Sequence, residues 1–136
     1  HILYYKKEVL MDIKELAKKY ELGKSDFWEM KFGGKSNWII THDATEKIAD
    51  IEKIIFHLPQ VFRDSNSNVA FLGEASKGDK RVWSTGESSS FNNKNPYNFA
   101  MAEKRLKDRL TLKIINAYEY GIYSDVEADD FKKKNN

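Results

Sequence analysis

The chain has 136 residues, 40% of them hydrophobic and 13% aromatic, which is enough for one globular domain (1–136) with a moderate core. The absence of cysteine excludes disulfides and thiolate metal sites, and it fits a reducing cytoplasm. No apolar run of about 18 residues occurs, which excludes an ordinary membrane-spanning helix and a membrane partner of that kind. No signal peptide is recognisable, although the chain begins at His1.

The formal net charge is only +2, but it is unevenly distributed along the chain. Residues 53–113 hold 11 Lys and Arg against 6 Asp and Glu, a balance of +5, whereas the rest of the chain carries −3. An excess of cations in one region is typical of proteins with an anionic partner. The middle of the chain is therefore where we expect such a partner to bind.

The sequence predicts an amphipathic helix over 8–20, because apolar side chains recur there every three or four residues. Gly23 follows the last turn and is expected to end the helix. A short element over 25–30 is then expected, followed by a break at Gly33–Gly34.

A short strand is predicted over 37–41, and a second helix over 42–53. Asp43 and Glu46 have the spacing of a capping box at the start of this helix. The side chains that it is expected to bury are Ala44, Ile48 and Ile51.

Three strands are predicted next. The apolar run 54–62 is interrupted by Pro59, which is typical of a strand that ends or lies at a sheet edge. The runs 68–76 and 81–87 flank the turn 77–80 and indicate a β-hairpin.

A long helix is predicted from Pro96 to Gly121, preceded by a polar loop over 88–95. Residues 125–136 form an acidic and then basic tail, expected to be flexible. The order of elements predicts an α+β fold, in which an antiparallel sheet or hairpin packs on a long basic helix, with short helices beside it. The continuous apolar stripe of this helix is Phe99, Ala102, Leu106, Leu110, Ile114 and Ala117.

Three cations of the long helix, Arg105, Arg109 and Lys113, recur every four residues beside the apolar stripe. Lys104 and Lys107 lie elsewhere on its polar surface. One interpretation is a solvated face with ion pairs such as Glu103 with Lys107. The other is a row of cations about 6 Å apart, which resembles the phosphate spacing of an extended single strand.

The hairpin adds further candidates. Lys77, Lys80 and Arg81 cluster at its turn, and Trp83 follows two residues later. Basic groups beside an exposed ring are typical of single-strand binding, because charge holds the backbone while the ring stacks on a base. Trp83 is alternatively a core residue, with the lysines solubilising the turn. Phe91 and Tyr97 in the polar loop are further stacking candidates.

Three stretches together resemble the phage single-strand annealing proteins, in the branch related to the eukaryotic recombination mediator and its Sak-type phage relatives. They are WIITHDATEKIA (38–49), VAFLGEASKGDKRVWSTGE (69–87) and AMAEKRLKDRLTLKII (100–115), the last followed by GIYSD. The family has a basic helix after a hairpin with a glycine-rich end. The chain departs from it at Asp108, where the family often has a lysine before the arginine.

The resemblance implies a protein that binds and anneals single-stranded DNA in phage homologous recombination and DNA repair, without nucleotide hydrolysis. It implies a ring or helical homo-oligomer in the bacterial cytoplasm, with a phage exonuclease or single-strand binding protein as possible partner. No cofactor or catalytic residue is expected, and the GGKS stretch at 33–36 lacks the rest of a phosphate-binding loop. The DNA-binding candidates are Lys80, Arg81, Lys104, Arg105, Lys107, Arg109 and Lys113.

Two alternatives remain open from the sequence. A metal-dependent nuclease would use His42 and carboxylates drawn from Asp43, Glu46, Glu74, Asp79, Glu87 and Glu103. A protein-interaction or structural module would instead use the acidic segment Asp125–Asp130 to bind a basic partner. Salt separates the second alternative from DNA binding, because phosphate contacts weaken steeply as salt rises.

Overall fold

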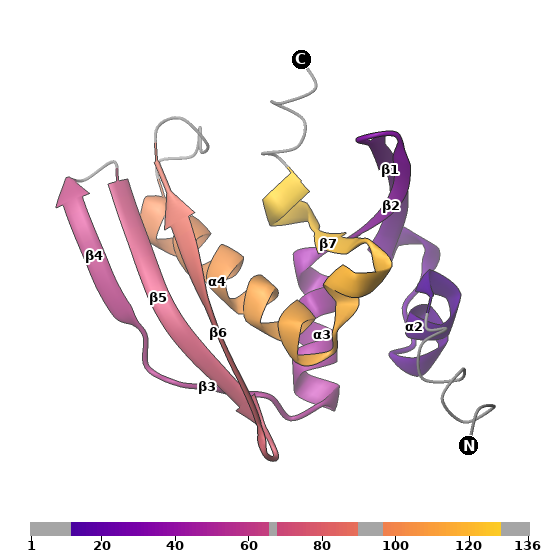
Figure 1. The fold of residues 1–136 in the computed structure, drawn as a ribbon, viewed down its shortest axis with the longest axis horizontal. Coiled ribbons are helices and arrows are strands. Elements are labelled where there is room, and N and C mark those ends of the chain that lie inside the picture. The colour runs from indigo at the N-terminus through magenta and orange to yellow at the C-terminus, as the bar shows by residue number, and fades with distance from the viewer. Residues whose placement is uncertain (1–11, 66–67, 90–96, 129–136) are drawn as a thin grey trace.

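The computed structural model describes residues 12–65, 68–89 and 97–128 and has an α+β fold (Figure 1). Two sheets lie at opposite ends of the molecule, and one long helix passes between them and packs against both. The predicted fold class is confirmed. Among the described residues, none of the helices combines the length and the apolar character that crossing a membrane requires.

The first sheet joins segments that are far apart in the sequence. It has the order β1 (Phe27–Phe32), β2 (Lys35–Ile40), β7 (Ile122–Ser124). β1 and β2 form an antiparallel hairpin around Gly33 and Gly34, whose φ angles of 60° and 73° suit glycine. β7 is parallel to β2 and was not predicted; it lies within the stretch GIYSD.

Three short helices lie beside this sheet. α2 (Ile13–Lys19) lies within the predicted 8–20 helix, and its N-cap is Asp12, whose carboxylate accepts from the Glu15 N–H. The one-turn η1 (Lys24–Asp26) leads into β1, so the predicted short element is a turn followed by a strand. η2 (Ala117–Tyr120) leads into β7.

The helix α3 (His42–Ile51) confirms the second predicted helix but not its cap. Thr41, not Asp43, is the N-cap, and its hydroxyl accepts from the Ala44 N–H at 3.0 Å. Ala44 and Ile48 are buried as predicted, whereas Ile51 is exposed in the last turn, beyond the buried face of the helix.

The second sheet contains the predicted hairpin, β5 (Asn68–Lys77) with β6 (Lys80–Ser88). On the other side of β5 lie β3 (Ile55–Phe56) and then β4 (Gln60–Ser65), with Pro59 between them. β5 is therefore the central strand, and β6 forms one edge of the sheet.

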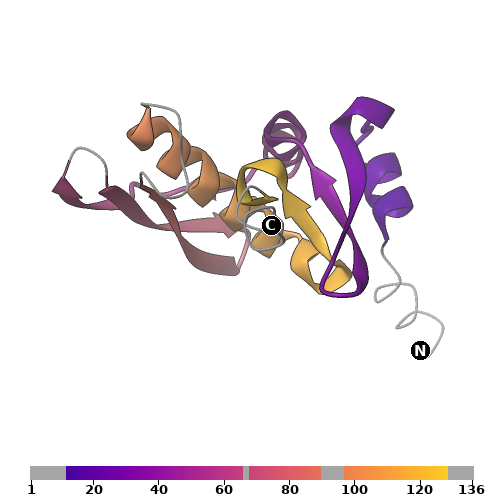
Figure 2. The ribbon, with the colours of Figure 1, turned by 90° about the horizontal axis from the view of Figure 1, so that it is seen from above.

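The long helix α4 (Asn98–Ile114) covers one face of the second sheet (Figure 2). It ends at Ile114, because Asn116 adopts a left-handed conformation, so the prediction that it continues to Gly121 is wrong. The stripe residues Ala102, Leu106 and Leu110 pack on Val69, Phe71 and Ala75 of β5. Phe99 of the stripe is exposed.

Helix α4 approaches the second sheet closely because glycine occupies the contact points on β5 and β6. A Cβ on Gly86 would lie 2.2 Å from the Ala102 carbonyl oxygen, and a Cβ on Gly73 would lie 2.7 Å from a Leu106 methyl carbon. Only a residue without a side chain fits at Gly86, since the nearest atoms belong to helix backbone. This close contact brings one side of α4 within reach of the edge strand β6.

Candidate nucleic-acid interface

The row of cations that the sequence placed on the long helix lies along the free edge of β6. Each cation of the row donates a hydrogen bond to a backbone carbonyl of β6. For every four residues forward along the helix, the accepting carbonyl lies two residues earlier in the strand. The three bonds are Arg105 Nη1 to Glu87 O at 2.8 Å, Arg109 Nη1 to Thr85 O at 2.7 Å and Lys113 Nζ to Trp83 O at 2.8 Å.

The two spacings match for a geometric reason. Four residues of helix rise about 6 Å, and two residues of strand span about 6.7 Å. Alternate carbonyls of an edge strand point away from the sheet and need partners. Because α4 runs antiparallel to β6, successive cations meet successive outward carbonyls, and the row satisfies the protein's own backbone.

The prediction that Arg105 contacts phosphate is therefore wrong for this fold. Its side chain is 0% exposed. Besides the Glu87 carbonyl, it donates through Nε to the carbonyl of Val126 at 3.1 Å, which joins the edge of β6 to the C-terminal segment. A buried guanidinium that binds two backbone segments is a structural group.

Arg109 is also committed within the protein. Its side chain is 17% exposed and lies between the carboxylates of Glu87, at 3.0 Å from Nη1, and Glu127, at 3.2 Å from Nε. Burial acts to lower the pKa of Arg109, but the two carboxylates outweigh burial and raise it. Because these bonds and the Thr85 carbonyl occupy its donors, the predicted phosphate contact of Arg109 is not available here. The expectation of a long basic helix is thus not confirmed.

Lys104 and Lys107 lie on another side of α4, and the structure does not bring them together with the hairpin cations. They line a shallow hollow with His42, Glu46 and Glu103. Lys107 pairs with Glu103 at 3.0 Å, as the i,i+4 spacing predicted.

Beside this hollow is a polar cluster between α3 and α4 that sequence reasoning missed. His42 Nδ1 lies 2.8 Å from Asp108 Oδ1, and its Nε2 lies 2.6 Å from Glu46 Oε1. The Thr45 hydroxyl donates to Asp108 Oδ1 at 2.6 Å. The hydrogen bond to Asp108 raises the pKa of His42, while burial raises the pKa of Asp108. Asp108, the departure from the family pattern, thus connects the two helices.

Trp83 is 65% exposed, so the alternative that it is a core residue is wrong. Its indole projects from β6 on the face opposite α4, and the Lys113 ammonium lies 5.4 Å from the ring centroid. Arg81 projects on the same face and forms a two-bond ion pair with Glu74, at 2.8 and 3.1 Å. Lys80 is exposed at the turn, where it donates to the Ile114 carbonyl at 2.7 Å.

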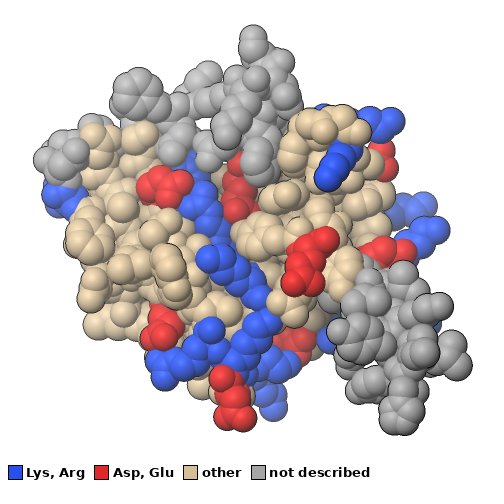
Figure 3. All heavy atoms as spheres, viewed as in Figure 1, with Lys and Arg blue, Asp and Glu red and all other residues tan. Residues whose placement is uncertain are grey.

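Three of the predicted cations therefore lie near Trp83, either at the start of β6 beside the hairpin turn or along the free edge of that strand. We call Lys80, Arg81 and Lys113 the basic band. Figure 3 shows Lys and Arg atoms forming a continuous band on this face of the molecule, which ends at the turn between β5 and β6. To one side of the band the surface of the second sheet carries few charges (Figure 3).

The other predicted stacking residues do not join this group. Tyr97 is exposed next to the start of α4, at the end of the sheet remote from Lys80. Phe91 lies outside the described residues.

The carboxylates considered for a nuclease are dispersed. Glu74 pairs with Arg81, Glu87 with Arg109, and Glu103 with Lys107. Within residues 12–65, 68–89 and 97–128, no three histidine or acidic side chains are arranged to hold a metal ion.

Comparison of the chain with protein-family models, with curated proteins and with solved structures finds no match.

Proposed function

We propose that this protein binds single-stranded DNA through Trp83 and the basic band, without nucleotide hydrolysis. The observation that carries the proposal is the exposed indole of Trp83, next to Lys113 and on the same strand as Lys80 and Arg81. Large aromatic rings are seldom left in water, and one flanked by cations suits a base attached to a phosphate backbone.

The arrangement favours a single strand over a duplex. In a duplex the faces of the bases are covered by their neighbours, so an exposed ring has no base to stack on. Lys80 and Arg81 belong to β6, and Lys113 reaches the edge of that strand from α4, so the cations follow a sheet edge and do not form one face of a helix that would enter a groove. Binding through phosphates and one ring depends little on base sequence.

The finer role follows from the resemblance to phage annealing proteins. We propose that the protein anneals complementary strands during phage recombination in the bacterial cytoplasm and acts as a homo-oligomer. An exonuclease or a single-strand binding protein of the phage would then be its partner.

A protein-interaction role is the second candidate, and one observation favours it. Leu58 is 96% exposed, and Phe62 and Trp83 are also exposed beside the second sheet, which gives an apolar surface of the kind that partner proteins cover. This role needs no phosphate contact, so salt and competitor DNA distinguish the two candidates.

The experiment is a binding titration of a labelled oligonucleotide, single-stranded or duplex, at low and moderate salt. We expect the single strand to bind more tightly and to weaken steeply with salt, because bound counterions are released. Absence of binding to the single strand at low salt would remove the proposal and favour the protein-interaction role.

A further inference from the structure

The face of the second sheet opposite α4, which we call the open face, carries no described helix (Figure 2). Its residues follow from the strand register. Across the sheet, Phe62 of β4 lies opposite Ala70 of β5, which lies opposite Glu87 of β6. Two residues further along β5, Leu72 lies opposite Gln60 of β4 on one side and Thr85 of β6 on the other.

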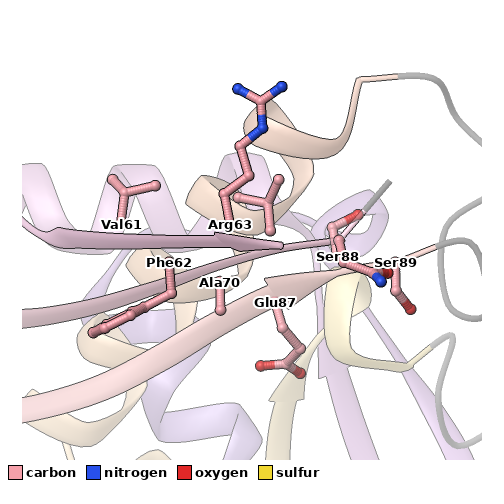
Figure 4. Close-up of a pocket in the computed structure, with 9 residues that line it drawn as sticks. Val61, Phe62, Arg63, Ala70, Glu87, Ser88 and Ser89 are labelled. Carbon is pink, nitrogen blue, oxygen red and sulfur yellow. The ribbon is translucent and has the colours of Figure 1, made fainter. Parts of the chain in front are cut away.

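A first hollow, of about 620 Å³, lies at the end of the sheet and is lined by residues of both faces, so only part of it belongs to the open face. Figure 4 shows Phe62, Ala70 and Glu87 projecting from one face there, whereas Val61 and Arg63 project from the other. Because neighbouring strands are about 4.8 Å apart, Phe62 and Glu87 stand roughly 10 Å apart with the small Ala70 between them. That gap admits one planar ring over Ala70.

A second hollow, of about 520 Å³, lies further along the same strands. Trp83 forms one wall, Leu58 and Gln60 form the opposite wall, and Leu72 and Glu74 line the hollow from the central strand. Trp83 lies opposite Glu74, which is four residues from Ala70 on β5, so the two positions are about 13 Å apart. That distance is roughly twice the phosphate spacing of an extended single strand.

The two hollows differ in the chemistry they offer a base. Trp83 provides a stacking face with a cation beside it. The first hollow provides the ring of Phe62, which is 55% exposed, and the partly exposed carboxylate of Glu87. Arg109 balances the charge of Glu87, and the remaining lone pairs of this carboxylate accept hydrogen bonds. A carboxylate accepts from the amino group of cytosine, whereas thymine presents a carbonyl oxygen at that position.

We propose that the open face holds two unstacked bases of a bound single strand, one at Trp83 and one between Phe62 and Glu87, and that the second position prefers cytosine to thymine. The occupant is a nucleic acid because the basic band lies along the same sheet, where the phosphates of such a strand would run. This inference rests on the proposed function, and it adds base preference to a site otherwise indifferent to sequence.

The test is fluorescence anisotropy with labelled oligo(dC) and oligo(dT) of about 12 nucleotides, a length within the range of single-strand sites. The variants are Phe62→Ala and Glu87→Gln, with Ile51→Ala as a control that removes an exposed apolar side chain from α3. Thermal unfolding checks that each variant is folded, and light scattering gives its oligomeric mass.

We expect the wild type to bind oligo(dC) about threefold to tenfold more tightly than oligo(dT). Phe62→Ala should weaken both by about fivefold or more, Glu87→Gln should remove the difference, and Ile51→Ala should change neither. If both open-face variants bind both oligonucleotides as the wild type does, the inference is wrong while single-strand binding stands. If the wild type binds neither, the proposed function fails first. A lower oligomeric mass of Phe62→Ala with unchanged binding would assign the face to protein contacts and overturn the inference.

Discussion

Arg109 Nη1 donates a hydrogen bond of 2.7 Å to the backbone carbonyl of Thr85, so a side chain of α4 satisfies an acceptor on the free edge of β6. The same guanidinium bridges Glu87 and Glu127, which joins the second sheet to the C-terminal segment. Arg109, which belongs to a row that matches the spacing of phosphates, therefore stabilises the fold instead.

Replacing Arg109 should therefore cost stability. Arg109→Gln leaves the buried carboxylate of Glu127 without its ion pair, and we expect the free energy of unfolding to fall by about 3 kcal/mol. The matched control, Lys107→Gln, removes an exposed ion pair and should change it by less than about 0.5 kcal/mol. Urea unfolding followed by circular dichroism measures both. Equal midpoints for the two variants would show that Arg109 has no structural role.

The contact of α4 with the sheet predicts a second cost. Gly86→Ala places a methyl group against the helix backbone, which cannot move without shifting α4, so we expect a loss of at least about 2 kcal/mol. Thr85→Ala, at the neighbouring exposed position, should have a small effect. Thermal unfolding compares the two variants, and a Gly86→Ala protein as stable as the wild type would contradict the close packing.

The His42 cluster predicts a pH dependence of stability. The pKa of His42 is raised in the folded state, so the protonated imidazole contributes stability that is present below its unfolded pKa and is lost as the pH rises through the folded pKa. The raised pKa of Asp108 acts in the same direction but from lower pH, since its effect begins at the ordinary pKa of an aspartate, about 4. The free energy of unfolding should thus decrease as the pH rises above about 6.5, the ordinary pKa of histidine.

Urea unfolding across this pH range measures the effect in the wild type, in His42→Asn and in the control His57→Asn. His42→Asn should flatten the dependence, whereas His57→Asn, exposed beside the second sheet, should keep it. If the free energy of unfolding of the wild type rose with pH over this range, the predicted role of His42 would be contradicted.

The basic band predicts the salt dependence of DNA binding. Each phosphate contact contributes about −0.7 to the slope of log affinity against log salt for a single strand, so three cations give a slope of about −2. Lys113→Gln keeps a donor for the Trp83 carbonyl but removes the charge, and it should reduce the slope by about 0.7. Lys104→Gln, on another side of α4, should leave the slope unchanged. If Lys104→Gln reduced the slope more than Lys113→Gln does, the phosphates would lie on the Lys104 side of α4 instead.

Local patterns in the sequence were sufficient for much of the fold. The hairpin β5–β6, the helix α3 and the buried stripe Ala102, Leu106, Leu110 follow from periodicity and turn residues, which act over a few positions. β7 was missed because three residues carry almost no periodicity and pair with a strand more than 80 positions away. Tertiary contacts decide such short strands.

The site was predictable only in part. Helical spacing places Arg105, Arg109 and Lys113 in one row, but the same spacing suits phosphates and the outward carbonyls of an edge strand. The close packing of α4 on Gly86 brings the row to the edge of β6, so strand carbonyls rather than phosphates accept its hydrogen bonds. The exposure of Trp83 was equally undetermined, because β6 alternates between a covered face and an open one, and its sequence does not say which face the helix covers.

The role of Trp83 is tested most directly by the affinity of Trp83→Ala for a labelled single strand at low salt, measured beside Trp28→Ala as an exposed-tryptophan control. We predict that Trp83→Ala remains folded and loses about tenfold or more in affinity, since stacking on one base contributes about 1–3 kcal/mol, whereas Trp28→Ala binds as the wild type does. Equal affinities of the wild type and the folded Trp83→Ala protein would contradict the account.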